Sequence, residues 1–62
     1  MKITEMLTEM QDVIINALVD ADKFDTKGNS AAGTRVRKYM QDIKAMAQNV
    51  RVAVSEKKNE DK

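Results

Sequence analysis

Several residue types that proteins use for chemistry are absent from this chain. Its 62 residues contain no Cys and no His. This excludes a disulfide framework and a thiolate zinc site, and it removes the commonest metal ligand and acid–base group. A chain of this length also buries too little surface to form a deep catalytic cleft. The sequence therefore predicts a protein that is not an enzyme and that uses no metal, no cofactor and no small-molecule substrate.

Long apolar runs are missing as well. Residues 1–5 lack the unbroken apolar stretch of a signal peptide, and no segment approaches the roughly 18 apolar residues of a membrane span. The absence of Cys agrees with a reducing compartment. We therefore expect a cytoplasmic protein without a membrane partner.

Proline is absent, and both glycines fall in one short stretch between two segments of helical periodicity. Gly28 suits the left-handed residue that ends a helix. Asn29 or Ser30 can accept hydrogen bonds from the free amides that begin the next helix. This stretch is therefore predicted to be a tight turn between two helices.

Apolar residues recur in both segments at alternating steps of four and three, which places them on one stripe of a helix. The first stripe consists of Ile3, Leu7, Met10, Ile14, Ala17, Ala21 and Phe24, widened by Met6, Val13 and Leu18. The second consists of Ala32, Val36, Tyr39, Ile43, Met46, Val50 and Ala53, widened by Met40, Ala47 and Val54. The pattern predicts helices over about 3–27 and 30–56, a turn at 28–30, and a disordered tail at 57–62, where apolar residues are nearly absent.

Two helices of similar length joined by a tight turn are predicted to fold back on each other as an all-α antiparallel hairpin. Each stripe is broader than two helices can cover, so a second copy of the chain is expected to cover the remainder. The predicted product is a homodimer that forms a four-helix bundle, with a higher oligomer as the alternative.

Two local patterns imitate ligand sites without meeting their requirements. Gly28 and Gly33 have the spacing of a phosphate-binding loop, but Thr34 stands where the phosphate-binding Lys is needed and no strand precedes the loop. The acidic run from Asp20 to Asp25 lacks the Gly and the bidentate Glu of a calcium loop. The first pattern is interpreted as a helix cap. The second is interpreted as a solvated helix face or as partners of nearby Lys residues.

Charge is distributed unevenly along the chain. Residues 1–27 hold six acids against three Lys, whereas residues 28–55 hold five cations against Asp42 alone, giving net charges of −3 and +4. Four cations of the second segment are spaced seven residues apart, which places them along one edge of a helix: Arg37, Lys44, Arg51 and Lys58. Arg35 and Lys38 flank the beginning of this row, where the opening amides of the helix add partial positive charge.

The row of cations in the second segment has two interpretations. It is either a solvated face that pairs with the acidic helix of the same or another hairpin, or a surface that binds phosphate. Four phosphate contacts would lose roughly a hundredfold in affinity between 50 and 200 mM salt. Since Tyr39 and Phe24 lie in the apolar stripes, no stacking platform accompanies the cations, and any nucleic-acid binding is predicted to be independent of base sequence.

The run from Gly28 to Lys38 resembles the bacterial and viral linker-histone-like family. That family includes the helical domain of the chlamydial histone-like protein and short relatives in Bacteroidetes and phages, with a similar Gly-Asn-x-Ala-Ala-x-x-Arg-x-Arg run. The resemblance implies DNA binding and nucleoid compaction, with Arg35 and Arg37 matching the paired Arg. Residues 56–62 depart from the long Lys-rich tail of the chlamydial members.

These observations lead to one functional hypothesis and one alternative. The hypothesis is a small histone-like, nucleoid-associated protein that binds the DNA backbone non-specifically as an oligomer, at the nucleoid or in host-cell cytoplasm. The predicted DNA-binding residues are Arg35, Arg37, Lys38, Lys44, Arg51 and Lys58, and the predicted turn and phosphate-approach residues are Gly28, Asn29 and Ser30. The alternative is a helical oligomerisation or protein-interaction module without nucleic-acid binding. A helix pair on a membrane surface is a weaker third reading, because the stripes have helical partners and the net charge is near zero.

Overall fold

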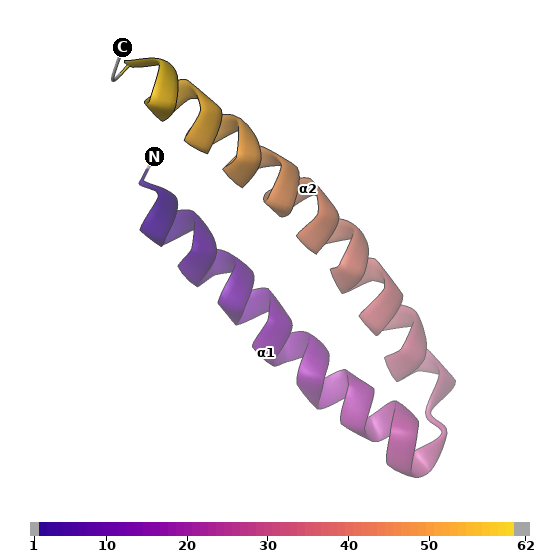
Figure 1. Ribbon diagram of the computed structural model, residues 1–62. Helices are drawn as coiled ribbons and strands as arrows, with labels where there is room; N and C mark the ends of the chain where they lie inside the picture. The colour runs from indigo at the N-terminus through magenta and orange to yellow at the C-terminus, as the bar shows by residue number, and fades with distance from the viewer. Residues whose placement is uncertain (1, 61–62) are drawn as a thin grey trace.

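The fold is a hairpin of two long helices. The computed structural model describes residues 2–60, in which α1 spans Ile3–Lys27 and α2 spans Ser30–Glu60. The helices lie side by side and antiparallel, so α1 begins at the end of the molecule where α2 finishes (Figure 1). No strand occurs within residues 2–60. The predicted all-α hairpin is therefore confirmed.

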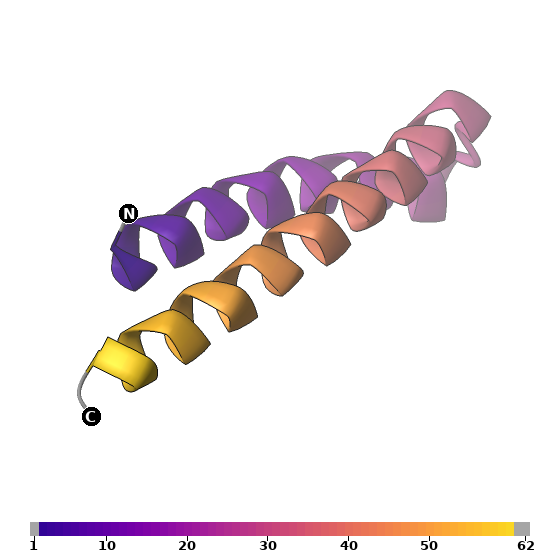
Figure 2. The ribbon, with the colours of Figure 1, turned by 90° about the horizontal axis from the view of Figure 1, so that it is seen from above.

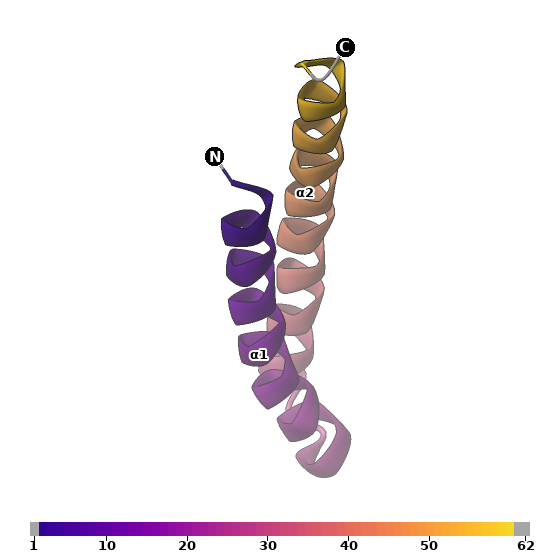
Figure 3. The ribbon, with the colours of Figure 1, turned by 60° about the vertical axis from the view of Figure 1, so that its left-hand side comes forward.

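The helices form a thin rod of 53 × 15 × 13 Å. They wind past each other rather than running strictly parallel (Figure 2). α2 is the longer helix, with 31 residues against 25 in α1. Its last turns project beyond the start of α1 (Figure 3).

α2 ends later than the sequence indicated. The predicted second helix finished near residue 56, whereas α2 continues to Glu60. Neither Gly nor Pro interrupts this segment, and Lys57 and Lys58 in the last turn complement the negative end of the helix dipole. Residues 57–60 of the predicted tail are thus helical, and residues 61–62 lie outside the described part of the chain.

The turn has the geometry predicted from its residue types. Gly28 adopts the left-handed conformation with φ 63° and ψ 27°, and its N–H donates to the Phe24 carbonyl oxygen at 3.0 Å. Asn29 then caps α2, since its side-chain oxygen accepts a hydrogen bond from the Ala32 N–H at 3.2 Å. The chain therefore reverses within two residues.

Few side chains are completely removed from solvent. Among residues 2–60 the buried apolar side chains are Ala17, which is 6% exposed, and Ala32, which is 0% exposed. Most of the interface between the helices is built from half-buried residues. These are Ile3, Met6, Met10 and Val13 on α1 and Val36, Tyr39, Ile43, Met46, Val50 and Ala53 on α2.

The face of α1 that meets α2 is rotated from the predicted stripe. Leu7, Ile14 and Phe24, which the periodicity placed at its centre, are each about half exposed. Met6 and Val13 occupy the interface instead. Ile3, Met10 and Ala17 belong to both the predicted stripe and the interface, so the centre of the contact face is rotated by about 50° around the helix. The rotation also brings Asp20 into the interface, where it pairs with Arg35 of α2.

Most of the exposed large apolar side chains among the described residues lie on one side of the hairpin. Because antiparallel helices turn in opposite senses when viewed from one end, residues that follow interface residues lie on the same side of the pair. We call this the open side, and it contains Leu7, Ile14 and Leu18 of α1 and Met40, Ala47 and Val54 of α2. The opposite side, the polar side, contains residues that precede interface residues: Glu9, Asn16, Arg35, Asp42 and Asn49.

The pockets between the helices agree with this division. A pocket of about 440 Å³ on the open side near the turn is lined by residues that include Ala21, Phe24, Gly33 and Val36. Gly33 allows the close approach there, since a Cβ at this position would lie 2.8 Å from the Phe24 ring. A smaller pocket of about 150 Å³ on the polar side is lined by Met6, Glu9, Met46 and Asn49. Residues of both helices therefore line a pocket on the open side and on the polar side of the hairpin.

Candidate nucleic-acid interface

The candidate interface is a row of cations on α2, which we call the basic row. It consists of Arg37, Lys44, Arg51 and Lys58, and all four side chains are exposed. At a rise of 1.5 Å per residue, neighbouring members of the row are about 10.5 Å apart along the helix and the row spans about 31 Å. Because α2 is long and unbroken, cations spaced seven residues apart form a row along one edge of the helix.

The basic row lies on the open side of the hairpin. Arg37, Lys44 and Arg51 directly follow Val36, Ile43 and Val50, which face α1. Met40, Ala47 and Val54 alternate with these cations along the same side of α2. The row thus borders apolar surface on one flank and solvent on the other.

No member of the basic row forms an ion pair with α1. Within residues 2–60 the structure shows one ion pair, between Asp20 and Arg35 on the polar side. The acids of α1 therefore do not neutralise the row within one hairpin. This removes one of the two partners, the same chain's acidic helix, that the sequence left open for these cations.

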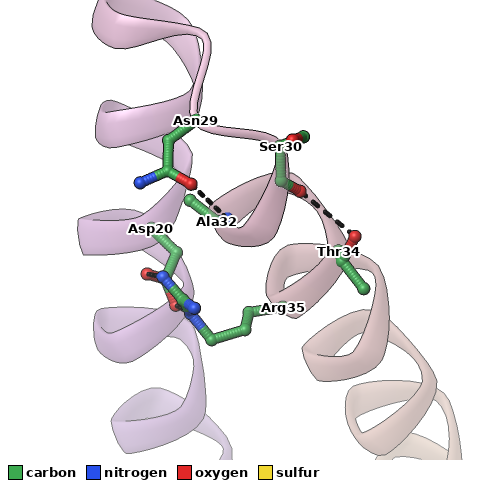
Figure 4. A network of polar contacts seen from close by, with 6 residues as sticks. All are labelled: Asp20, Asn29, Ser30, Ala32, Thr34 and Arg35. Atoms are coloured by element: carbon green, nitrogen blue, oxygen red, sulfur yellow. Dashed lines mark hydrogen bonds and ion pairs between the residues drawn. The ribbon is translucent and has the colours of Figure 1, made fainter.

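Arg35 is held by a bidentate contact, unlike the basic row (Figure 4). Its Nε donates to Asp20 Oδ2 at 3.1 Å and its Nη2 donates to Asp20 Oδ1 at 3.0 Å. Asp20 is 6% exposed, whereas the Arg35 side chain is 47% exposed. The two parallel hydrogen bonds match the planar guanidinium to the carboxylate. Two of the donors of Arg35 are thereby committed to the hairpin itself.

This contact shifts the pKa of both groups. The hydrogen bond from Arg35 holds the pKa of Asp20 below its ordinary value, with partial burial opposing the shift and the charges of Arg35 and Lys23 adding to it. The hydrogen bond to Asp20 correspondingly raises the pKa of Arg35 above its ordinary value. Both groups therefore carry their charges at neutral pH.

The remaining predicted site residues lie at or near the start of α2. Lys38 is exposed and lies next to Arg37 in sequence, but it points about a quarter turn away from the basic row. The side-chain oxygen of Asn29 is occupied by the Ala32 amide, and the Ser30 carbonyl oxygen accepts a hydrogen bond from Thr34 Oγ1 at 3.1 Å (Figure 4). The structure thus separates the predicted cations into the basic row, Lys38 and the paired Arg35.

The two aromatic side chains do not form a stacking surface along the basic row. Tyr39 is half-buried in the contact between the helices, and Phe24 lies against Gly33 beside the turn, where it lines one pocket together with Arg37. Neither ring alternates with the cations in the manner of a base-stacking surface. The geometry of the row therefore suits contacts to a phosphate backbone.

Residues 2–60 contain no group of three or more Asp, Glu, His or Cys side chains arranged for metal binding. Within the same residues, neither helix has an apolar window long enough to cross a bilayer.

Comparison with known protein families identifies the family of this chain. The family profile described as histone H1-like protein Hc1 matches residues 4–60, which include both helices and the turn. The chain belongs to the Hc1 family. Neither the curated proteins nor the solved structures contained a significant match. The suspected linker-histone-like resemblance is thereby confirmed, and histone H1-like proteins of this kind are not enzymes.

One functionally relevant residue of this Hc1-family chain was not recognised in the sequence. The sequence places Asp20 in an acidic run interpreted as a solvated face or as partners of nearby Lys residues, whereas in the structure it is the buried partner of Arg35. A signal was present, because Asp20 continues the spacing of Met6, Met10, Val13 and Ala17 by a further step of three. A carboxylate at an interface position points to a cationic partner on the facing helix.

Proposed function

We propose that this protein binds the backbone of duplex DNA without sequence preference, and that it acts as an oligomer at the nucleoid. The observation that carries the proposal is the basic row, four exposed cations that form no ion pair within residues 2–60. Membership in a histone H1-like family supports DNA as the polyanion. Cations without stacking aromatics favour phosphate contacts, which carry affinity rather than sequence recognition.

The length of the basic row fits a stretch of duplex. A row of about 31 Å corresponds to about nine base pairs at a rise of 3.4 Å per pair. Its spacing of about 10.5 Å offers one cation for about every three base pairs. Because each strand winds once around the axis in about 10 base pairs, a straight α2 lying along the duplex would pass the phosphates of both strands rather than follow one strand.

The cations have different proposed roles. Arg37, Lys44, Arg51 and Lys58 are the proposed phosphate contacts. Lys38 adds long-range attraction from outside the row, and the start of α2 at Gly28–Ser30 adds the positive end of the helix dipole. We assign Arg35 primarily to the stability of the hairpin, because Asp20 already takes two of its donors.

Oligomerisation would increase the affinity for DNA. A single row with four contacts supports only salt-sensitive binding, whereas a dimer presents two rows on one particle. The proposed assembly is a homodimer that forms a four-helix bundle, in which apolar residues on the open sides of two hairpins are covered and the basic rows stay accessible at the edge of the contact. The exposed apolar residues of both helices support this arrangement.

Salt titration of duplex binding tests the proposal. The expected result is binding at about 50 mM salt whose logarithm falls linearly with log salt, with a slope of about −0.9 for each phosphate contacted. Random-sequence and defined-sequence duplexes should bind equally. Absence of binding at about 50 mM salt, where backbone contacts are strongest, would contradict DNA as the partner.

The apolar open side favours a second candidate function, a helical interaction module without nucleic-acid binding. Charge reversal separates the two candidates. Under the DNA proposal, Arg37→Glu with Lys44→Glu abolishes DNA binding and leaves the oligomeric mass unchanged. Under the second candidate the cations pair with acids of another hairpin, and the same variant dissociates the oligomer.

A further inference from the structure

The open side of α1 carries the largest concentration of exposed apolar side chains in the described chain. Leu7, Ile14, Ile15 and Leu18 are between 49% and 68% exposed and occupy adjacent turns of one helix face. Exposed apolar residues that cluster in this way mark an interaction surface. Within residues 2–60 the buried apolar side chains are two alanines, Ala17 and Ala32. The single chain therefore buries little apolar surface, and covering this face would bury more.

The open face differs between the two helices in charge. Between Leu7 and Ala21 the open face of α1 contains apolar residues and the neutral Thr8 and Gln11, without a charged side chain. On α2 the corresponding strip has a cation in every second position, at Arg37, Lys44 and Arg51. Interfaces place apolar residues at the centre and charges at the rim. The centre of a docking surface therefore lies over α1 rather than midway between the helices.

We propose that a second copy of this chain docks on the open face of α1, so that the two α1 helices pack antiparallel about a two-fold axis near Ile14. The proposal specifies the surface of the oligomer named above and in that respect rests on the proposed function. The two α2 helices then flank the contact, and their basic rows stay at its rim.

The face is complementary to itself in this arrangement. With the two-fold axis at Ile14, each Leu7 lies opposite the small Ala21 of the second copy, and the two Ile14 side chains meet. The large Leu7 thus opposes the small Ala21 on both halves of the contact, and a two-fold interface requires a patch that is complementary to itself in this way. Gln11 and Leu18 widen the contact without bringing like charges together.

A dimer centred on α2 lacks this complementarity. An antiparallel pair of α2 helices would bring the basic rows of both copies to one contact, with Lys44 near Lys44 of the second copy. Like charges placed opposite each other oppose association. The cations therefore favour the α1-centred contact and leave α2 available for a polyanion.

Disulfide cross-linking tests the position of the two-fold axis, because the natural chain has no Cys. Mild oxidation of Ile14→Cys should give a covalent dimer in high yield, since equivalent residues beside a two-fold axis approach within disulfide distance. Asn16→Cys, an exposed position on the polar side, is the matched control and should remain mostly uncross-linked. A monomeric Ile14→Cys, or a Met40→Cys variant that cross-links faster, overturns the proposal.

A charge substitution provides an independent measurement. Ile14→Lys with Leu18→Lys should weaken dimerisation by at least about a hundredfold in sedimentation analysis, since charges would enter an apolar contact. The control is Val52→Lys, a comparably exposed apolar residue away from the open side of α2, which should leave the mass unchanged. Loss of helix content together with dissociation also supports the proposal, whereas a double variant with the natural mass overturns it.

The cross-linked Ile14→Cys dimer separates this proposal from DNA binding. If the covalent dimer forms and binds duplex DNA, both proposals are supported. If it forms and does not bind at about 50 mM salt, the docking surface stands and the DNA proposal fails. If the chain binds DNA but Ile14→Cys does not cross-link, the docking surface is wrong and DNA binding stands.

Discussion

Asp20 and Arg35 show how one polar pair can orient two helices. Asp20 lies in the face of α1 that contacts α2, where the other positions of the same spacing are occupied by Met, Val or Ala. Its carboxylate is satisfied by two hydrogen bonds from Arg35. A buried carboxylate without such a partner would be strongly unfavourable, so the pair favours the rotation of α1 that brings the two residues together.

Removing the charge of Asp20 should alter the dependence of stability on pH. Because the pKa of Asp20 is lower in the folded chain, its contribution to stability is present above about pH 3.9 and is lost as the pH falls through the folded-state pKa. Asp20→Asn should therefore be less stable than the natural chain at neutral pH and should lose less stability on acidification. Thermal unfolding followed by circular dichroism at pH 7 and pH 3 measures both effects.

Asp22→Asn is the matched control for this change. It removes an exposed carboxylate two residues further along α1, on the side of the helix away from Asp20. This carboxylate makes no ion pair within residues 2–60. It should leave the stability at neutral pH close to that of the natural chain. Equal effects of the two substitutions would contradict a specific role of the Asp20–Arg35 pair.

The cap of α2 allows a second prediction at the residue scale. Asn29→Ala removes the oxygen that accepts from the Ala32 amide and should lower the free energy of unfolding by about 1 kcal/mol. For a domain of this size, that corresponds to a fall in Tm of roughly 4–8 °C. Asn29→Ser retains a capping oxygen and should stay near the natural Tm. An unchanged Tm for Asn29→Ala would show that the cap contributes little.

At the scale of the helices, α1 was predicted accurately in length and inaccurately in rotation. Its bounds agree with the sequence because Gly28 ends the helix through a local conformational preference. Its contact face agrees with the predicted stripe at Ile3, Met10 and Ala17 and differs in the second row. Two adjacent apolar rows, one through Leu7 and Ile14 and one through Met6 and Val13, both fit the heptad spacing. Which of the two rows faces α2 depends on contacts with α2, and the periodicity of α1 carries no information about those contacts.

The basic row allows a prediction for α2 as a unit. Replacing Arg37, Lys44 and Arg51 together with Gln should reduce the magnitude of the salt slope for DNA binding by about 2.7, because each lost phosphate contact removes about 0.9. The change is measured by titrating a fluorescent duplex at several salt concentrations. The helices should remain intact, because all three side chains are exposed.

A triple variant elsewhere in the chain controls for net charge. Gln replacements of Lys23, Lys27 and Lys57 change the net charge equally at exposed positions outside the basic row. They should alter the salt slope much less. If both triple variants reduce the slope to the same extent, binding follows total charge rather than the row.

The whole molecule is a single layer of two helices with little core. Among residues 2–60 no large side chain is fully buried, and the open side exposes apolar residues of both helices. A hairpin of this kind gains only modest stability from its own contacts. Stability supplied by a second copy must depend on the concentration of the chain.

Thermal unfolding at two concentrations measures this dependence. For a dimer that unfolds to separate chains, a hundredfold increase in concentration adds about 2.7 kcal/mol per dimer. With the average unfolding entropy per residue, this corresponds to a rise in Tm of roughly 10 °C. A monomeric hairpin would show the same Tm at both concentrations, and that result would contradict the proposed oligomer.

The amino-acid sequence by itself determined the properties that depend on neighbouring residues. The two helices follow from apolar spacing, the turn from Gly28 and Asn29, and the basic row from cations repeated every seven residues. The tertiary structure alone decided which face of α1 meets α2, the pairing of Asp20 with Arg35, and the separation of Arg35 from the basic row. These features depend on the rotation of one helix against another, and that rotation is set by contacts between side chains far apart in the sequence.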